Sequence, residues 1–179
     1  PRVLRLERPH PPRRTDMREA AASAALAVCL DERSRPGGEW HEAVSGWISG
    51  RIRKVARRAR GSHWRAVEGL PGRTVARGDA EARAFPPSRV RELPKELSRL
   101  QISGSEVEPD EAGAPEPGTP ILWLNPDAPM SAGKAAAQVG HATMFLAALL
   151  HGDGLDAELE AWWKAGTPCS VRTADQATW

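Results

Sequence analysis

The chain has 179 residues, enough for one or two domains with a sizeable hydrophobic core. Its net charge is only +2, but basic residues outnumber acidic ones before residue 105, so a negatively charged partner would meet that part first. No apolar run is long enough to span a bilayer, which excludes a membrane-spanning helix. Cys29 and Cys169 match no metal or disulfide spacing, so we expect buried thiols in the reducing cytoplasm.

Two helices are predicted first. Residues 16–30 form one, because Asp16 and Glu19 have the spacing of a capping box before an alanine-rich apolar run. Residues 39–60 form the other, with one apolar stripe and with Gly61 just beyond its end. Its opposite face carries Arg51, Arg53, Lys54, Arg57, Arg58 and Arg60.

Two interpretations are open for this basic face. Cations near a helix C-terminus compensate the helix dipole, which is the usual role of such a face. Six cations within ten residues exceed that need, and arginine suits bidentate contact with phosphate. We therefore favour contacts with an RNA backbone through Arg53, Lys54, Arg57 and Arg58.

The middle of the chain predicts smaller elements and a linker. Residues 73–85 predict a hairpin with Gly78-Asp79 at its tip, and residues 96–100 predict a short helix. Residues 105–119 are rich in Glu, Pro, Gly and Ala without apolar periodicity, which indicates an extended acidic linker. We divide the chain into a basic α+β domain at 1–104, the linker at 105–119 and an α/β domain at 120–179.

The most informative stretch is 120–151. An apolar strand at 121–124 precedes a turn, and Ser131 is a good N-cap for a helix that ends near Gly152. Lys134 would lie in the first turn, where the positive end of the helix dipole disfavours a cation, so its position suggests a use. Its ammonium and the free N–H groups of that turn would converge on a phosphate or a developing oxyanion, and Gly133 would let the anion approach.

Gln138 and His141 follow Lys134 on the same predicted helix face. The simpler interpretation is that the lysine is solvated and that the other two side chains are structural polar groups. A Walker-type phosphate loop is excluded, because Ala128 and Ala135 stand where its pattern requires Gly and Ser or Thr. Beyond the helix, residues 155–163 predict an amphipathic helix and residues 169–172 a strand, which together imply a partly parallel sheet.

These residues carry a family resemblance. Asp127 and the string Gly133-Lys134-x-Ala136-Ala137-Gln138-x-x-His141-Ala142 resemble the first strand and helix of the type-2 peptidyl-tRNA hydrolases, over about the last third of the chain. Asn125-Pro126 and Val139-Gly140 depart from the family's usual residues. The chain also stops before the family's downstream Gln-Asp-Ala-Gly segment and begins with Pro1 in place of Met, so we expect a fragment at both ends.

The resemblance implies a three-layer, mixed-sheet, hydrolase-like α/β domain, incomplete at its C-terminus, after a mainly helical basic domain with a hairpin. It implies hydrolysis of the ester between a peptide and the tRNA 3′ end by water, which recycles tRNA in translation and ribosome rescue. Lys134 would be catalytic, and Gly133, Gln138, His141 and Asp127 would bind substrate or support the site.

The resemblance implies no cofactor and no metal. Peptidyl-tRNA would be the partner, and no membrane would be involved. A homodimer is the oligomeric state that we consider. One alternative is a non-catalytic RNA-binding or regulatory protein on a hydrolase-like scaffold. A weaker alternative is an interaction domain whose basic helix binds an acidic protein.

Overall fold

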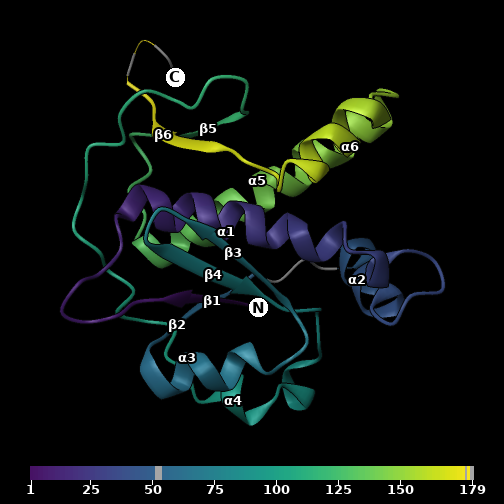
Figure 1. The fold of residues 1–179 in the computed structure, drawn as a ribbon, viewed down its shortest axis with the longest axis horizontal. Helices are drawn as coiled ribbons and strands as arrows, with labels where there is room; N and C mark the ends of the chain where they lie inside the picture. Colours follow the sequence, from purple (N-terminus) through teal and green to yellow (C-terminus); the bar gives the residue numbers. More distant parts are fainter. Residues whose placement is uncertain (51–53, 176, 178–179) are drawn as a thin grey trace.

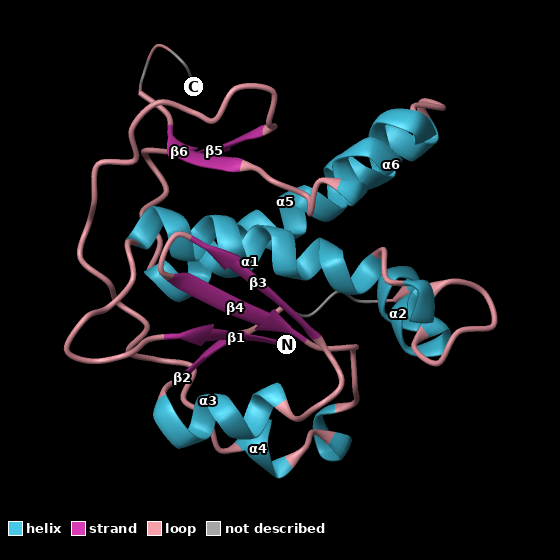
Figure 2. Cartoon of the chain, viewed as in Figure 1, coloured by secondary structure: helices cyan, strands magenta, loops and turns pink. Residues whose placement is uncertain are grey.

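The computed structural model describes residues 1–50, 54–175 and 177, which form a mixed α/β fold (Figures 1 and 2). Its elements in chain order are β1 (Arg2–Arg5), α1 (Arg14–Cys29), η1 (Glu32–Ser34), α2 (His41–Ser49), β2 (Ala56–Ala59), α3 (Gly61–Glu68), β3 (Arg73–Arg77), β4 (Ala80–Ala84), η2 (Val90–Glu92), α4 (Lys95–Ser98), β5 (Ile121–Leu124), α5 (Ala132–Gly152), α6 (Asp156–Lys164) and β6 (Ser170–Thr173).

The strands form two separate sheets. The larger has the order β2-β1-β4-β3, in which β1 runs parallel to β2 and antiparallel to β4. The smaller pairs β5 with β6 in parallel, with Leu122 opposite Val171. In Figure 2, α1 and α5 lie between the two sheets, while α3 and α4 cover the outer face of the larger sheet.

This layering follows from the alternation of side chains along β1. Leu4 faces a core that it shares with α1 and with Ala132 and Ala136 of α5, whereas Val3 faces Trp64 and the outer helices. A third cluster joins α1 and α5 to the smaller sheet. Helix α1 is therefore buried on almost every side, which explains why it is rich in alanine and other apolar residues.

The predicted capping box of α1 is wrong. The helix begins at Arg14, and the side chain of the N-cap residue, Arg13, makes no capping hydrogen bond. Asp110 from the acidic stretch caps the helix instead, because its Oδ1 accepts hydrogen bonds from the Thr15 N–H and the Thr15 hydroxyl, each at 3.1 Å. Glu19 accepts from the backbone N–H of Val171 and so links α1 to β6.

The predicted helix over residues 39–60 is also wrong in its second half. Helix α2 ends at Ser49, and residues 56–59 form β2, whose flanks are held by backbone hydrogen bonds from Arg2 N–H to Val55 and from Leu6 N–H to Ala59. Pairing with a distant strand outweighs the local helical pattern here. Gly61 begins α3, with a φ of +50°, instead of ending a helix.

The other predicted elements are confirmed. The hairpin forms as β3 and β4, the short helix as α4, and the central strand and helix as β5 and α5. The last helix and strand form as α6 and β6. The mixed α/β class is therefore correct, while the three-layer hydrolase-like domain stays a prediction.

The two parts that we divided at residues 105–119 lie against each other. Helix α1 of the first part packs along α5 of the second, and residues of both contribute to the same hydrophobic clusters. The acidic stretch between them has no regular secondary structure, yet Ser105 and Val107 are buried. Over the described ranges, no helix combines the length and apolarity needed to cross a membrane.

Candidate functional site

The N-terminus of α5 borders a cavity of about 300 Å³. Its walls come from the residues that lead into β2, from the start of the acidic stretch and from the first turn of α5. The residues on which the site depends are Lys54, Ser105, Glu106, Gly133 and Lys134. The fold thus brings a residue of the predicted basic cluster to the helix that carries the predicted catalytic lysine.

The first turn of α5 is capped from two directions. The Ser131 hydroxyl accepts a hydrogen bond from the Lys134 N–H at 3.3 Å, as its predicted role as N-cap requires. Glu106 Oε2 accepts from the Ala132 N–H at 3.3 Å. Because the first four N–H groups of a helix have no partner within it, these two caps satisfy part of the positive helix end.

Lys134 is exposed at the cavity, and no residue that the structure describes pairs with its ammonium. Ser105, across the cavity, is only 2% exposed, and its hydroxyl has no hydrogen-bond partner among the described residues. A methyl group on Gly133 would lie 3.4 Å from the Cβ and Oγ of Ser105, so glycine keeps this contact loose. The cavity is therefore lined by a lysine without an ion-pair partner among the described residues and by a serine whose buried hydroxyl has no hydrogen-bond partner there.

Lys54 links the cavity to two predicted site residues. Its Nζ lies 2.6 Å from Gln138 Oε1 and 2.6 Å from His141 Nδ1. The sequence placed Lys54 on an RNA-binding face and placed Gln138 and His141 on the Lys134 face of α5. In the structure Gln138 and His141 hold Lys54, and Lys134 lies one turn away at the helix start.

The protonation state of this group follows from its surroundings. Burial lowers the pKa of His141, and the positive charges of Lys54 and Arg2 lower it further. Burial, followed by the charge of Arg2, also lowers the pKa of Lys54. His141 is therefore neutral at pH 7, with the lone pair of Nδ1 facing the ammonium and the proton on Nε2, a buried donor without a partner among the described residues.

The remaining predicted site residues lie elsewhere. Asp127 is exposed in the turn after β5, where its backbone N–H donates to Asn125 Oδ1 at 2.7 Å, and it does not line the cavity. Arg57 donates to the carbonyl oxygen of Leu100 at 2.6 Å. Arg58 donates to the carbonyl oxygen of Ser103 at 2.9 Å and also bonds the side chain of Gln101. Arg51 and Arg53 lie outside the described residues.

The arginines of β2 thus have a structural task that the sequence did not reveal, since they hold residues 98–103 against the sheet. Contact of Arg53, Lys54, Arg57 and Arg58 with RNA stays a prediction. Sequence reasoning also missed Ser105 and Glu106, because a stretch without apolar periodicity gives no signal of packing against a distant helix. Within residues 1–50, 54–175 and 177, no group of three or more His, Cys, Asp or Glu side chains is placed to hold a metal ion.

No family model, curated protein or solved structure matches this chain. The resemblance of residues 120–179 to the type-2 peptidyl-tRNA hydrolases therefore remains an expectation.

Proposed function

We propose that the protein is a peptidyl-tRNA hydrolase-like enzyme of the cytoplasm, which cleaves the ester between a peptide and the 3′ end of tRNA and so recycles tRNA. The family resemblance suggests this reaction. The observation that supports it best is Lys134, an exposed cation without a partner among the described residues, at the mouth of a cavity on the positive end of α5.

The reaction places negative charge where this cavity is positive. Water loses a proton as it adds to the ester carbonyl, whose oxygen becomes an oxyanion. Collapse of that intermediate breaks the bond to the 3′ oxygen, which takes up a proton in place of the one that water lost. The Lys134 ammonium and the helix dipole would stabilise the oxyanion. Gln138 and His141 would act by holding Lys54 at the cavity wall, where it adds a second positive charge.

The phosphates of tRNA would be bound by the basic residues around β2. Replacing Arg57 and Arg58 together by alanine should weaken tRNA binding and flatten the plot of log affinity against log salt concentration. The matched double lysine variant keeps both charges and should keep the slope. An unchanged slope in the alanine variant would mean that these arginines do not contact tRNA phosphates and have only a structural role. Self-association as a homodimer stays a prediction.

Steady-state hydrolysis of peptidyl-tRNA by the intact protein tests the catalytic assignment. Lys134→Ala should lower kcat/KM by about 100-fold or more, because it removes one charged stabiliser of the oxyanion. Lys164→Ala is the control, since Lys164 is an exposed lysine on α6 that pairs with Glu160 at 2.8 Å. Equal kcat/KM values for the two variants would remove Lys134 from the mechanism.

One observation favours the non-catalytic alternative, a tRNA-binding or regulatory protein. The carboxylate of Glu106 already occupies the Ala132 N–H at the helix start, where an oxyanion would otherwise bind. A protein that only binds RNA would tolerate this cap. Tight tRNA binding by the unmodified protein without any peptide release would favour the alternative.

A further inference from the structure

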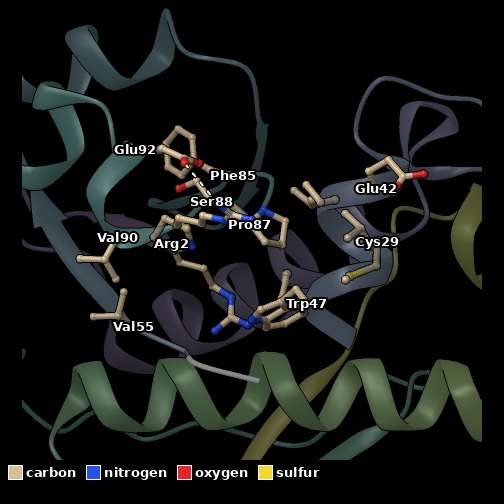
Figure 3. Close-up of a pocket in the computed structure, with 18 of the residues that line it drawn as sticks. Arg2, Cys29, Glu42, Trp47, Val55, Phe85, Pro87, Ser88, Val90 and Glu92 are labelled. Carbon is tan, nitrogen blue, oxygen red and sulfur yellow. Dashed lines mark ion pairs between the residues drawn. The ribbon is translucent and has the colours of Figure 1, made fainter. Parts of the chain in front are cut away.

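A second and larger cavity, of about 730 Å³, lies between α1, α2 and the segment that follows β4 (Figure 3). Its volume is in the range of small-molecule sites. Its walls are mainly apolar and include Val28, Val44, Val55, Phe85, Val90 and Met144. Among the described residues it shares only Val55 with the cavity at the start of α5, so it is a separate site.

Arg2 is one of the residues that line this cavity, and it is 6% exposed. Figure 3 shows the side chain reaching from β1 toward α5 beside Trp47. Its Nη1 donates to the carbonyl oxygens of Ala136 at 3.3 Å and Ala137 at 3.2 Å, and no described residue accepts a hydrogen bond from Nε. Two neutral carbonyl groups satisfy one nitrogen and leave the positive charge without a counter-ion.

The acidic groups nearby do not balance this charge. Burial raises the pKa of the Cys29 thiol to about 11, although Arg2 opposes the shift, so Cys29 is neutral at pH 7. Glu92 pairs with Arg89 and Arg91, and Glu42 is exposed and forms no ion pair with Arg2. By sequence, residues 51–53 are Arg-Ile-Arg and contribute no carboxylate.

Arg2 stays charged at neutral pH, because burial lowers its pKa only to about 10. Burial of a charge without a counter-ion is unfavourable. The guanidinium also needs space beside α5. Gly140 of α5 provides that room, since a methyl group there would lie 2.5 Å from Arg2 Cζ. The guanidinium therefore occupies a position that the helix leaves open for it.

We propose that the larger cavity binds a small apolar molecule with one carboxylate, whose carboxylate pairs with Arg2 while its hydrocarbon body contacts the apolar walls. A guanidinium matches the geometry of a carboxylate, and one uncompensated cation balances one negative charge. A neutral ligand would leave the Arg2 charge buried and unpaired. A dianion would bring one more negative charge than Arg2 can neutralise. The proposal is independent of peptidyl-tRNA hydrolysis and does not use Lys134.

Calorimetric titration of the intact protein with octanoate and with 1-octanol tests this, since the two probes share their hydrocarbon chain and differ in charge. Octanoate should bind with one site per chain and at least about tenfold more tightly than 1-octanol, because only octanoate forms charge-assisted hydrogen bonds with Arg2. Equal affinities, or no octanoate binding, would overturn the proposal.

Two variants separate the charge from the cavity. Arg2→Met keeps much of the side-chain length but removes the charge, and it should lower octanoate affinity by about tenfold or more and abolish the preference over 1-octanol. Met144→Trp leaves Arg2 in place and fills the cavity, so it should weaken the binding of both octanoate and 1-octanol. This variant tests the cavity even if Arg2→Met proves unstable. Unchanged octanoate affinity in a folded Arg2→Met variant, or in Met144→Trp, contradicts the assignment.

Discussion

The missing side chain of Gly140 lets α5 accept the buried guanidinium of Arg2. An added methyl group would lie 2.5 Å from Arg2 Cζ and 2.8 Å from the Cβ of Ala25, so the Arg2 side chain and α1 would both have to shift. Gly140→Ala should therefore lower the free energy of unfolding by about 1 to 3 kcal/mol in urea titrations, despite the better helix propensity of alanine. Gly152→Ala, at the other end of α5 with open space around it, is the control and should not destabilise the protein.

His141 should make stability depend on pH below neutrality. Its pKa lies below the ordinary value of 6.5 in the folded protein, mainly through burial and then through Lys54 and Arg2. The unfolded chain therefore takes up the proton first, so the free energy of unfolding should fall as the pH drops below 6.5 toward the folded pKa. Urea titrations at several pH values between 7 and 5 measure this slope.

His141→Asn keeps an acceptor near Lys54 but cannot be protonated, so its slope between pH 7 and 5 should be shallower than that of the unmodified protein. His151 provides a control of opposite sign, because its hydrogen bond with Asp156 raises its pKa. The stabilising effect of this hydrogen bond is present at low pH and is lost as the pH rises through the folded pKa of His151. His151→Asn should therefore not flatten the decline in the free energy of unfolding between pH 7 and 5. Identical slopes for His141→Asn and the unmodified protein would contradict the assigned neutral state.

The cap of α5 was predictable from the sequence by a local rule, whereas the local rule for a capping box failed at Asp16. Ser131 caps α5 because its hydroxyl and the N–H of Lys134 are three residues apart, a relation that needs no tertiary structure. The partner of Gln138 and His141 was not predictable in this way. Lys54 reaches them from the segment that leads into β2, 84 positions away from Gln138 in the chain, and no local rule relates residues that far apart.

Among the elements, the acidic stretch 105–119 acts as a helix cap for both α1 and α5. Asp110 bonds Thr15 at the start of α1, and Glu106 bonds Ala132 at the start of α5. Asp110→Ala should lower the free energy of unfolding by about 1 kcal/mol, the usual effect of losing a helix cap. Glu108→Ala, two residues earlier at an exposed position, should change it by less than about 0.5 kcal/mol. Equal effects of the two substitutions in urea titrations would mean that Asp110 is not a cap.

Strands β1 and β2 were not predicted from the sequence, and residues 56–59 show why. Ala56 and Ala59 continue the apolar spacing of α2, so the local pattern is helical. In the structure they pair with Arg2 and Arg5 of β1, at the far end of the basic part. A parallel pair joins segments that are distant in sequence, so the local hydrophobic periodicity does not predict the pairing.

At the scale of the whole molecule, the contact between α1 and α5 unites the parts that the sequence suggested as separate domains. Arg172 of β6 also pairs with Glu19 of α1 at 2.8 Å, and both side chains are largely buried. We expect one cooperative unfolding transition for residues 1–104 and 120–179 together, because removing either part would expose the shared core.

Coincident urea curves from tryptophan fluorescence and far-ultraviolet circular dichroism would meet this expectation. Tryptophans in both parts report on it, with Trp40 and Trp64 in the first and Trp162 in the second. Two separated transitions would instead favour independent domains.

Peptide release from peptidyl-tRNA under single-turnover conditions, with enzyme in excess, tests the role of Lys134 most directly, because it separates chemistry from tRNA binding. The intact protein should release peptide, and Lys134→Ala should be slower by about 100-fold at saturation with its tRNA affinity almost unchanged. Release at equal rates by Lys134→Ala and the unmodified protein, at saturation, would contradict an oxyanion site at the start of α5.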